Sequence, residues 1–176
     1  IPTYNRADFF DYSLEVHIPM VKQYNIEICI FDNASTDNTC EVVLKWMKEY
    51  AFLTYHKNEI NIGPDANFER ALKYPQTNYV WLLGDTYQLE SGTIEYIMEL
   101  IKNDCFDHIL INVGNEIKDI KTQVYQDQNK LLEDLFWLMT CLSVHIYSHS
   151  LIKEANFSRY RNSNFIQTGI IFEYID

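Results

Sequence analysis

Two aspartates each follow a short apolar run, and these are the residues that most clearly suggest chemistry. Asp32 follows the run IEICIF (26–31), and Asp85 follows the run YVWLLG (79–84). If both runs are strands, each delivers one carboxylate to the edge of a sheet. A carboxylate in that position can accept a hydrogen bond from a ligand or coordinate a hard cation such as Mg²⁺.

Polar turns follow the apolar runs, as a ligand site would require. They read TYNR (3–6), DNASTDN (32–38), NEINIGPD (58–65) and GDTY (84–87). In a parallel sheet, ligands bind beyond the carboxyl ends of the strands, so these turns are expected to converge on one rim. Asp, Asn and Ser also suit ordinary turns and helix caps. From these turns alone, a ligand site and a set of plain connections both remain open.

The elements that must position these turns alternate along the chain. Buried strands are expected at 26–31, 52–57, 79–85 and 107–113, and a further strand at 143–147. Helices are expected at 35–50, 58–74, 91–103 and 129–139, with short helices at 150–157 and 164–175. Strand–helix alternation of this kind predicts an α/β layer fold with a mostly parallel sheet flanked by helices, in a single domain.

Composition narrows the classes of partner. The 176 residues are 47% hydrophobic, which favours a real core, and the formal net charge of −11 argues against nucleic acid or anionic lipid as a bulk partner. No run reaches the ~18 apolar residues of a transmembrane segment. Four scattered cysteines without a CxxC pair suggest a reduced, cytoplasmic chain. No glycine-rich dinucleotide or phosphate loop is present.

Four motifs together point to a family. PTYNR, FDNASTDNT, NIGPDANFERAL and YVWLLGD occur in the order and spacing that resembles the nucleotide-sugar half of the family 2 glycosyltransferases, inverting enzymes of GT-A fold. HIYSHSLIKEANFSRYRNSNF (145–165) is more weakly similar to the family's acceptor-side segment. The resemblance implies one GT-A-like domain over 1–176, with a nucleotide-sugar half at 1–103 and an acceptor-side half at 104–176.

The resemblance also implies an activity and its partners. The chain would move a sugar, most simply from a UDP-sugar, to a glycan or lipid-linked acceptor with inversion, as in polysaccharide biosynthesis. Mg²⁺ or Mn²⁺ would assist. The protein would be cytoplasmic, with peripheral association with membrane-bound enzymes at the cytoplasmic face of a membrane.

Individual roles follow only from the matching motif positions. Asp32 would hydrogen-bond the base, and Asp85 would be the first acid of the DxD motif, near the ribose and the metal. The remaining residues implied to line the donor nucleotide are Pro2, Thr3, Tyr4, Gly63 and Asn67.

One position departs from the family pattern. The family commonly has Asp-x-Asp at these positions, whereas this chain has Asp85-Thr86-Tyr87. A neutral phenol is a poor ligand for Mg²⁺, which prefers hard oxygen ligands. The alternative hypothesis is therefore a catalytically impaired nucleotide-binding or scaffolding module of the same fold. An unrelated phosphate-binding α/β domain is a third hypothesis, which the lack of a glycine-rich cradle disfavours.

The catalytic base stays unassigned. Inverting transfer needs a carboxylate that takes the proton of the acceptor hydroxyl. Glu173 and Asp176 are the candidates in the C-terminal segment, and Asp127, Glu133 and Asp134 are further acidic residues on the acceptor side. No hydrophobic strand precedes IPTYNR, so we expect the natural start and part of the sheet to be missing. The base could likewise lie beyond Asp176.

Overall fold

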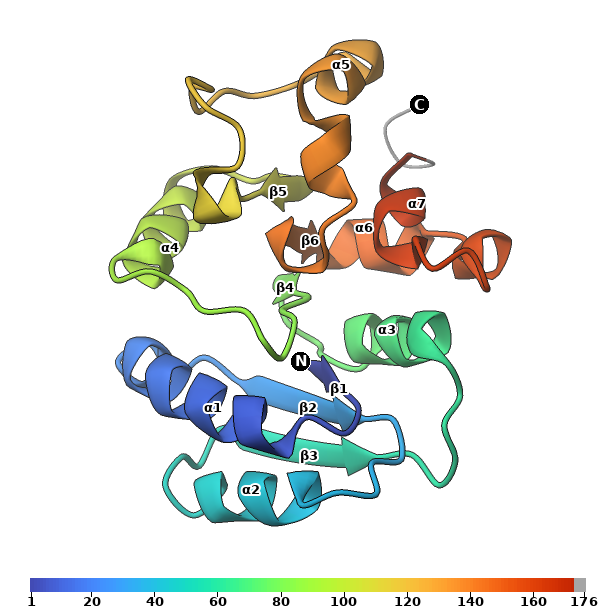
Figure 1. Cartoon of the computed structure of the whole chain (residues 1–176). Coiled ribbons are helices and arrows are strands. Elements are labelled where there is room, and N and C mark those ends of the chain that lie inside the picture. The colour runs from blue at the N-terminus through green and yellow to red at the C-terminus, as the bar shows by residue number, and fades with distance from the viewer. Residues whose placement is uncertain (173–176) are drawn as a thin grey trace.

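The computed structural model describes residues 1–172 and shows strands and helices in alternation (Figure 1). The strands are β1 (Pro2–Thr3), β2 (Ile28–Asp32), β3 (Leu53–Lys57), β4 (Tyr79–Trp81), β5 (His108–Leu110) and β6 (His145–Ser148). The helices are α1 (Ala7–Lys22), α2 (Thr39–Trp46), α3 (Pro64–Lys73), α4 (Thr93–Asn103), α5 (Gln128–Met139), α6 (His149–Glu154) and α7 (Ile166–Phe172). Short 3₁₀ turns lie at Val113–Asn115, Leu142–Val144 and Phe157–Tyr160.

The first sheet is parallel and has the order β1-β2-β3. Its central strand is buried throughout, which explains why ICIFD reads as an unbroken apolar run ending in a single acid. Pro2 pairs with Phe31 and Thr3 with Asp32, so the two strands end at the same edge. The predicted α/β fold with a parallel sheet flanked by helices is therefore confirmed.

The second sheet is antiparallel, with the order β4-β6-β5. The alternation of strands and helices along the sequence does not reveal this pairing. β6 lies between β4 and β5, which both precede it in the chain, and is antiparallel to each. The sheet takes β4 from the expected nucleotide-sugar half and β5 and β6 from the expected acceptor-side half. The division of the chain near residue 103 stays a prediction.

Two buried clusters lie on opposite faces of β2. Cys29 and Phe31 face the larger cluster with Leu72 of α3, whereas Ile28 and Ile30 face the second cluster with Leu14 of α1. The split follows from the strand geometry, since successive side chains point to opposite faces. In Figure 1, α3 accordingly covers one side of the parallel sheet, and α1 and α2 cover the other.

Helix α1 was not expected from the sequence. Its buried face consists of Phe10, Leu14, Ile18 and Val21, at intervals of three and four residues, which is helical spacing. Pro19 lies within the helix near its last turn, on the exposed side. The helix packs against α2, which makes it one wall of the second cluster.

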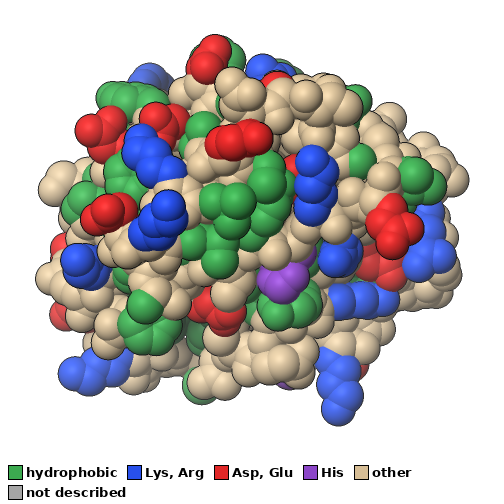
Figure 2. All heavy atoms as spheres, turned by 90° about the horizontal axis from the view of Figure 1, so that it is seen from below, with side chains coloured by type: hydrophobic (Ala, Val, Ile, Leu, Met, Phe, Trp, Pro, Cys, Tyr) green, Lys and Arg blue, Asp and Glu red, His purple; other side chains and the backbone are tan. Residues whose placement is uncertain are grey.

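The charged surface is mixed in sign. Figure 2 shows the face over α2 and β3, where basic and acidic side chains are interspersed around a small hydrophobic patch. The excess of acid over base is therefore not gathered into one region of this face. Within residues 1–172, no helix is both long and apolar enough to cross a bilayer.

Candidate functional site

The ends of β1 and β4 meet through one hydrogen bond. Thr3 Oγ1 donates to Asp85 Oδ2 at 2.8 Å, and Thr3 is itself paired with Asp32 in the sheet. The two aspartates therefore lie at one rim, although β2 and β4 belong to different sheets. Asp85 is half-buried, and burial raises the pKa of its carboxyl, an effect that the Thr3 hydroxyl and the positive charge of Arg6 partly offset.

Asp32 is fully buried, and protein groups contact both of its oxygens. Oδ1 accepts from the backbone N–H of Ser35 at 2.8 Å, and Oδ2 accepts from the Tyr55 hydroxyl at 2.5 Å. The Lys57 ammonium lies 4.0 Å from Oδ2. The carboxylate thus fixes the first turn after β2. A bond to a nucleotide base would have to be added to these contacts.

Four asparagines join the turns after β2 and β3, and we call them the asparagine cluster. Asn33 donates to the Asn61 side chain at 2.9 Å and accepts from the Asn58 side chain at 3.0 Å. Asn58 also donates to Asn67 Oδ1 at 3.1 Å, and Asn67 Nδ2 donates to the carbonyl of Phe31 at 2.8 Å. Sequence reasoning identified Asn67 but not the other three, although all lie in the polar turns that it singled out.

The other predicted site residues surround this network. Gly63 adopts a φ of 82°, which favours glycine, and it begins α3 at Pro64. Its N–H donates to Asn61 Oδ1 at 2.9 Å. Pro2 is buried in the sheet, whereas Tyr4 just beyond β1 is 45% exposed. Of the predicted donor-binding side chains, Tyr4 is therefore openly available at the rim, and Asp85 is partly so.

Comparison with known proteins decides the family. The model of glycosyl transferase family 2 matches residues 1–168. The chain belongs to glycosyl transferase family 2. Abequosyltransferase RfbV of Salmonella typhimurium is 28% identical over 178 residues, covering 99% of this chain and 49% of RfbV. The chain thus spans about half the length of this curated relative.

Solved structures show the same fold. Staphylococcus aureus TarS 1–349 aligns with a TM-score of 0.71 at 17% identity, over 96% of this family 2 chain and 52% of that chain. The mannosyltransferase PcManGT of Pyrobaculum calidifontis, solved with GDP-Man and Mn²⁺, aligns with a TM-score of 0.61 at 14% identity, over 89% and 46% of the two chains. The family 2 chain therefore has the GT-A fold.

Tyr87 is a packing residue in this family 2 chain. It is half-buried and contacts both hydrophobic clusters, and its N–H donates to the Gly84 carbonyl at 3.2 Å. Burial raises the pKa of its hydroxyl, and Cys141 and Glu116 add to the rise. The phenol therefore packs against the core from a partly buried position.

The rim offers a divalent ion one carboxylate ligand, that of Asp85. Asp85 uses Oδ2 for Thr3, which leaves Oδ1 for a cation, and no cluster of three acidic, His or Cys side chains suited to a metal occurs within residues 1–172. Mg²⁺ is commonly held by one or two carboxylates together with substrate phosphates. The site fits a metal that a bound diphosphate helps to hold.

The acidic residues of the acceptor side have structural partners. Asp127 caps α5 by accepting from the backbone N–H groups of Asn129 and Lys130, at 2.8 and 3.0 Å. Glu133 and Asp134 both contact the ammonium of Lys130. Asp127 thus acts as an N-cap, whereas Glu133 and Asp134 form ion pairs on the surface of α5. Glu173 and Asp176 lie outside the described residues.

The segment similar to the acceptor side packs on α3. Glu69 of α3 accepts two hydrogen bonds from Arg161, at 2.9 and 3.0 Å. Asp65, one turn earlier, accepts from the backbone N–H of Asn164 at 3.0 Å. Because α3 also carries Asn67, these contacts connect residues 161–164 to the rim.

Replacing Tyr87 by Asp tests its packing role. We expect Tyr87→Asp to lower the free energy of unfolding by about 2–4 kcal/mol, because it removes ring contacts and introduces a charge into a partly buried position. Mn²⁺-supported binding of UDP should not improve, since the side chain at 87 packs against the two hydrophobic clusters. Denaturant melting and calorimetry measure the two effects.

Thr86→Asp is the matched control, because it adds the same charge one residue earlier at an exposed position. It should leave the unfolding free energy within about 0.5 kcal/mol of the unmodified chain. A Tyr87→Asp protein of unchanged stability that binds UDP more tightly with Mn²⁺ would contradict the packing role and restore the interpretation of position 87 as a lost ligand.

Proposed function

We propose that this chain is the donor-binding part of an inverting glycosyltransferase. It moves a sugar from a nucleoside diphosphate, most simply a UDP-sugar, to a glycan or lipid-linked acceptor. The observation that carries the proposal is the Thr3–Asp85 contact beside the buried Asp32, at the carboxyl ends of the strands, in a chain of family 2. Ligands of open α/β sheets bind at this edge.

The roles of the side chains follow from their exposure. Tyr4 is open to a nucleotide, and Asp85 offers one oxygen to the ribose or to Mg²⁺ or Mn²⁺ beside the diphosphate. Asp32 and Asn67 have their polar atoms engaged by protein groups, so their main task is to shape the turns around the nucleotide. Gly63 lets the backbone of the β3–α3 turn approach the ligand closely.

Transfer of the sugar requires stabilisation of the negative charge that develops on the leaving diphosphate. The acceptor oxygen attacks the anomeric carbon as the bond to the diphosphate breaks, and a carboxylate takes the acceptor's proton. Asp85 would help to hold a divalent ion, which when bound would supply Lewis acidity to the departing diphosphate. Asp85 orients this end of the donor. Glu173 and Asp176 remain our candidates for the base.

Two structural relatives support a nucleoside-diphosphate sugar as the donor, and one of them supports UDP. TarS has been solved with UDP-GlcNAc, and PcManGT with GDP-Man and Mn²⁺. RfbV, the curated relative, is an abequosyltransferase, which supports a role in polysaccharide biosynthesis. We further propose that the protein works in the cytoplasm, at the cytoplasmic face of a membrane, beside membrane-bound enzymes that supply a lipid-linked acceptor.

A second candidate function is nucleotide binding without efficient transfer. The observation in its favour is that Asp85 is the sole carboxylate of the Asp85-Thr86-Tyr87 motif, whose tyrosine packs against the hydrophobic clusters. Such a module would bind the nucleotide through the same rim and act as a scaffold for its partners. It would show little dependence on a divalent ion.

Calorimetry with UDP, in Mn²⁺ and in EDTA, tests both functions. The transferase predicts UDP binding that is at least tenfold tighter with Mn²⁺, whereas the scaffold predicts equal binding in both buffers. If neither UDP nor GDP binds in either buffer, both the transferase and the scaffold are ruled out. ATP serves as the control for general attraction of nucleotides.

A further inference from the structure

The loop that carries Asp85 has neither helix nor strand within residues 82–92. It runs from the end of β4 at Trp81 to the start of α4 at Thr93. A loop of this kind keeps its shape only where its backbone groups find partners in the rest of the protein. The residues that bond to its backbone therefore decide where the Asp85 carboxylate lies.

The backbone just before Asp85 is held by Ser143, which is fully buried. The N–H of Gly84 donates to Ser143 Oγ at 2.9 Å. The indole N–H of Trp81 donates to the Ser143 backbone carbonyl at 2.8 Å. The core of the protein thus fixes one end of the loop.

The backbone after Asp85 is held by a histidine of α1. The N–H of Leu89 donates to His17 Nε2 at 3.1 Å, and both residues are buried. The other ring nitrogen, Nδ1, lies 3.1 Å from the hydroxyl of Ser13, one turn earlier on the helix. Because Nε2 is an acceptor, the proton of the neutral imidazole is on Nδ1, which donates to Ser13. Each ring nitrogen therefore has one partner.

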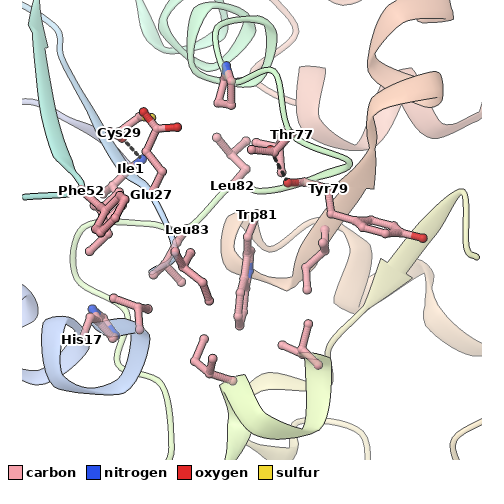
Figure 3. Close-up of a pocket in the computed structure, with 18 of the residues that line it drawn as sticks. Ile1, His17, Glu27, Cys29, Phe52, Thr77, Tyr79, Trp81, Leu82 and Leu83 are labelled. Carbon is pink, nitrogen blue, oxygen red and sulfur yellow. Dashed lines mark hydrogen bonds between the residues drawn. The ribbon is translucent and has the colours of Figure 1, made fainter. Parts of the chain in front are cut away.

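The surroundings of His17 keep the ring in the form that this bond needs. Figure 3 shows His17 on α1 at one end of an apolar cavity, with Leu83 between it and Trp81 in this view. Burial lowers the pKa of His17 to about 4. At neutral pH the imidazole is therefore uncharged and keeps the lone pair that accepts from Leu89.

We propose that His17 is a positioning residue for Asp85. It holds the far end of the loop, so that the carboxylate stays against Thr3 and open to a divalent ion beside the diphosphate. The role toward the ligand rests on the proposed function, whereas the role toward the loop rests on the hydrogen bonds alone. A purely structural histidine would lower stability when replaced, but it would not act through Asp85.

Three variants of α1 separate these roles. His17→Leu removes the acceptor, and His17→Gln keeps one, because its amide oxygen can take the place of Nε2. Val21→Ala is the matched control, since Val21 lies one turn further on α1 and is buried in the same hydrophobic cluster. Denaturant melting of all three shows how much stability each substitution costs.

The first readout is amide exchange at Tyr87, whose N–H bonds to the Gly84 carbonyl and so reports on the loop without contacting His17. His17→Leu should speed this exchange at least about tenfold over Val21→Ala, because the loop opens without its anchor. His17→Gln should return it to within about threefold of the unmodified chain.

The second readout is the affinity for UDP in Mn²⁺ and in EDTA. His17→Leu should weaken binding in Mn²⁺ about tenfold and change little in EDTA, and His17→Gln should recover most of the loss. In the Asp85→Asn background, His17→Leu should weaken binding by less than about twofold, because the carboxylate that it positions is already lost.

Equal weakening by His17→Leu with and without the Asp85 carboxylate would overturn the proposal, and so would unchanged exchange at Tyr87. If the unmodified chain binds neither UDP nor GDP, the proposed transferase fails, and exchange at Tyr87 alone decides whether His17 holds the loop. Should His17→Leu not fold, His17→Asn takes its place, because its shorter amide reaches Ser13 but not Leu89.

Discussion

Asp85→Asn is expected to weaken UDP binding in Mn²⁺ by about ten- to a hundredfold, equivalent to about 1–3 kcal/mol. Asparagine keeps the size of the side chain and can still accept the hydrogen bond from Thr3. It loses the negative charge that would hold a divalent ion against the diphosphate. Calorimetry of both proteins in Mn²⁺ and in EDTA measures the difference, and binding in EDTA should change little.

Thr3→Val is the matched control, because it removes the hydrogen bond and leaves the carboxylate. Its effect on UDP binding should be smaller than that of Asp85→Asn. Acid should imitate Asp85→Asn in the unmodified chain: burial raises the pKa of Asp85, so its charge is lost at a higher pH than for an exposed aspartate. Equal Mn²⁺ dependence in Asp85→Asn and the unmodified chain would place the metal elsewhere.

Asp32→Ala is expected to lower the free energy of unfolding by about 2–4 kcal/mol, because it leaves the Ser35 N–H and the Tyr55 hydroxyl without their acceptor in a buried position. For a chain of this size, the melting temperature should fall by about 4–16 °C. UDP binding should also weaken, since the turn after β2 loses its anchor. Differential scanning calorimetry and UDP titration at 10 °C separate the two effects.

Tyr55→Phe removes one of those two bonds and keeps the ring. Burial and the neighbouring Asp32 raise the pKa of the Tyr55 hydroxyl, so it stays protonated and donates at any working pH. The substitution should cost about 1 kcal/mol and leave UDP binding nearly unchanged. An Asp32→Ala protein that melts normally but fails to bind UDP would instead assign Asp32 to direct contact with the base.

The parallel sheet was predictable because its signal is local. Ile28, Ile30 and the residues between them form a short β-branched run, and Asp32 ends it at the rim. The second sheet was not predictable in the same way. β4 and β5 have apolar runs of their own, but their partner β6 lies more than thirty residues further along the chain, and only the packed core determines that it runs against both.

The sequence predicts that Asp32 and Asp85 share one rim, and in the structure Thr3 pairs with Asp32 and donates to Asp85, although β4 belongs to the antiparallel sheet. The roles of these residues toward a ligand, and those of Gly63 and Asn67, stay predictions. What the sequence could not give is where each side chain points. Asp32 and Asn67 are buried and bond to protein partners, and Tyr87 packs its ring against the two hydrophobic clusters, since covering the ring is more favourable than exposing it.

The asparagine cluster has a consequence for how the rim responds to its surroundings. Amide side chains do not ionise, and neutral hydrogen bonds are not weakened by the ionic screening that acts on charge pairs. The bonds among Asn33, Asn58, Asn61 and Asn67 should therefore hold equally in dilute buffer and in concentrated salt, and across the physiological pH range. A change in ionic strength would then act on the nucleotide's own charges and on the guanidinium of Arg70, which donates to Asn58, while the bonds among the four asparagines stay constant.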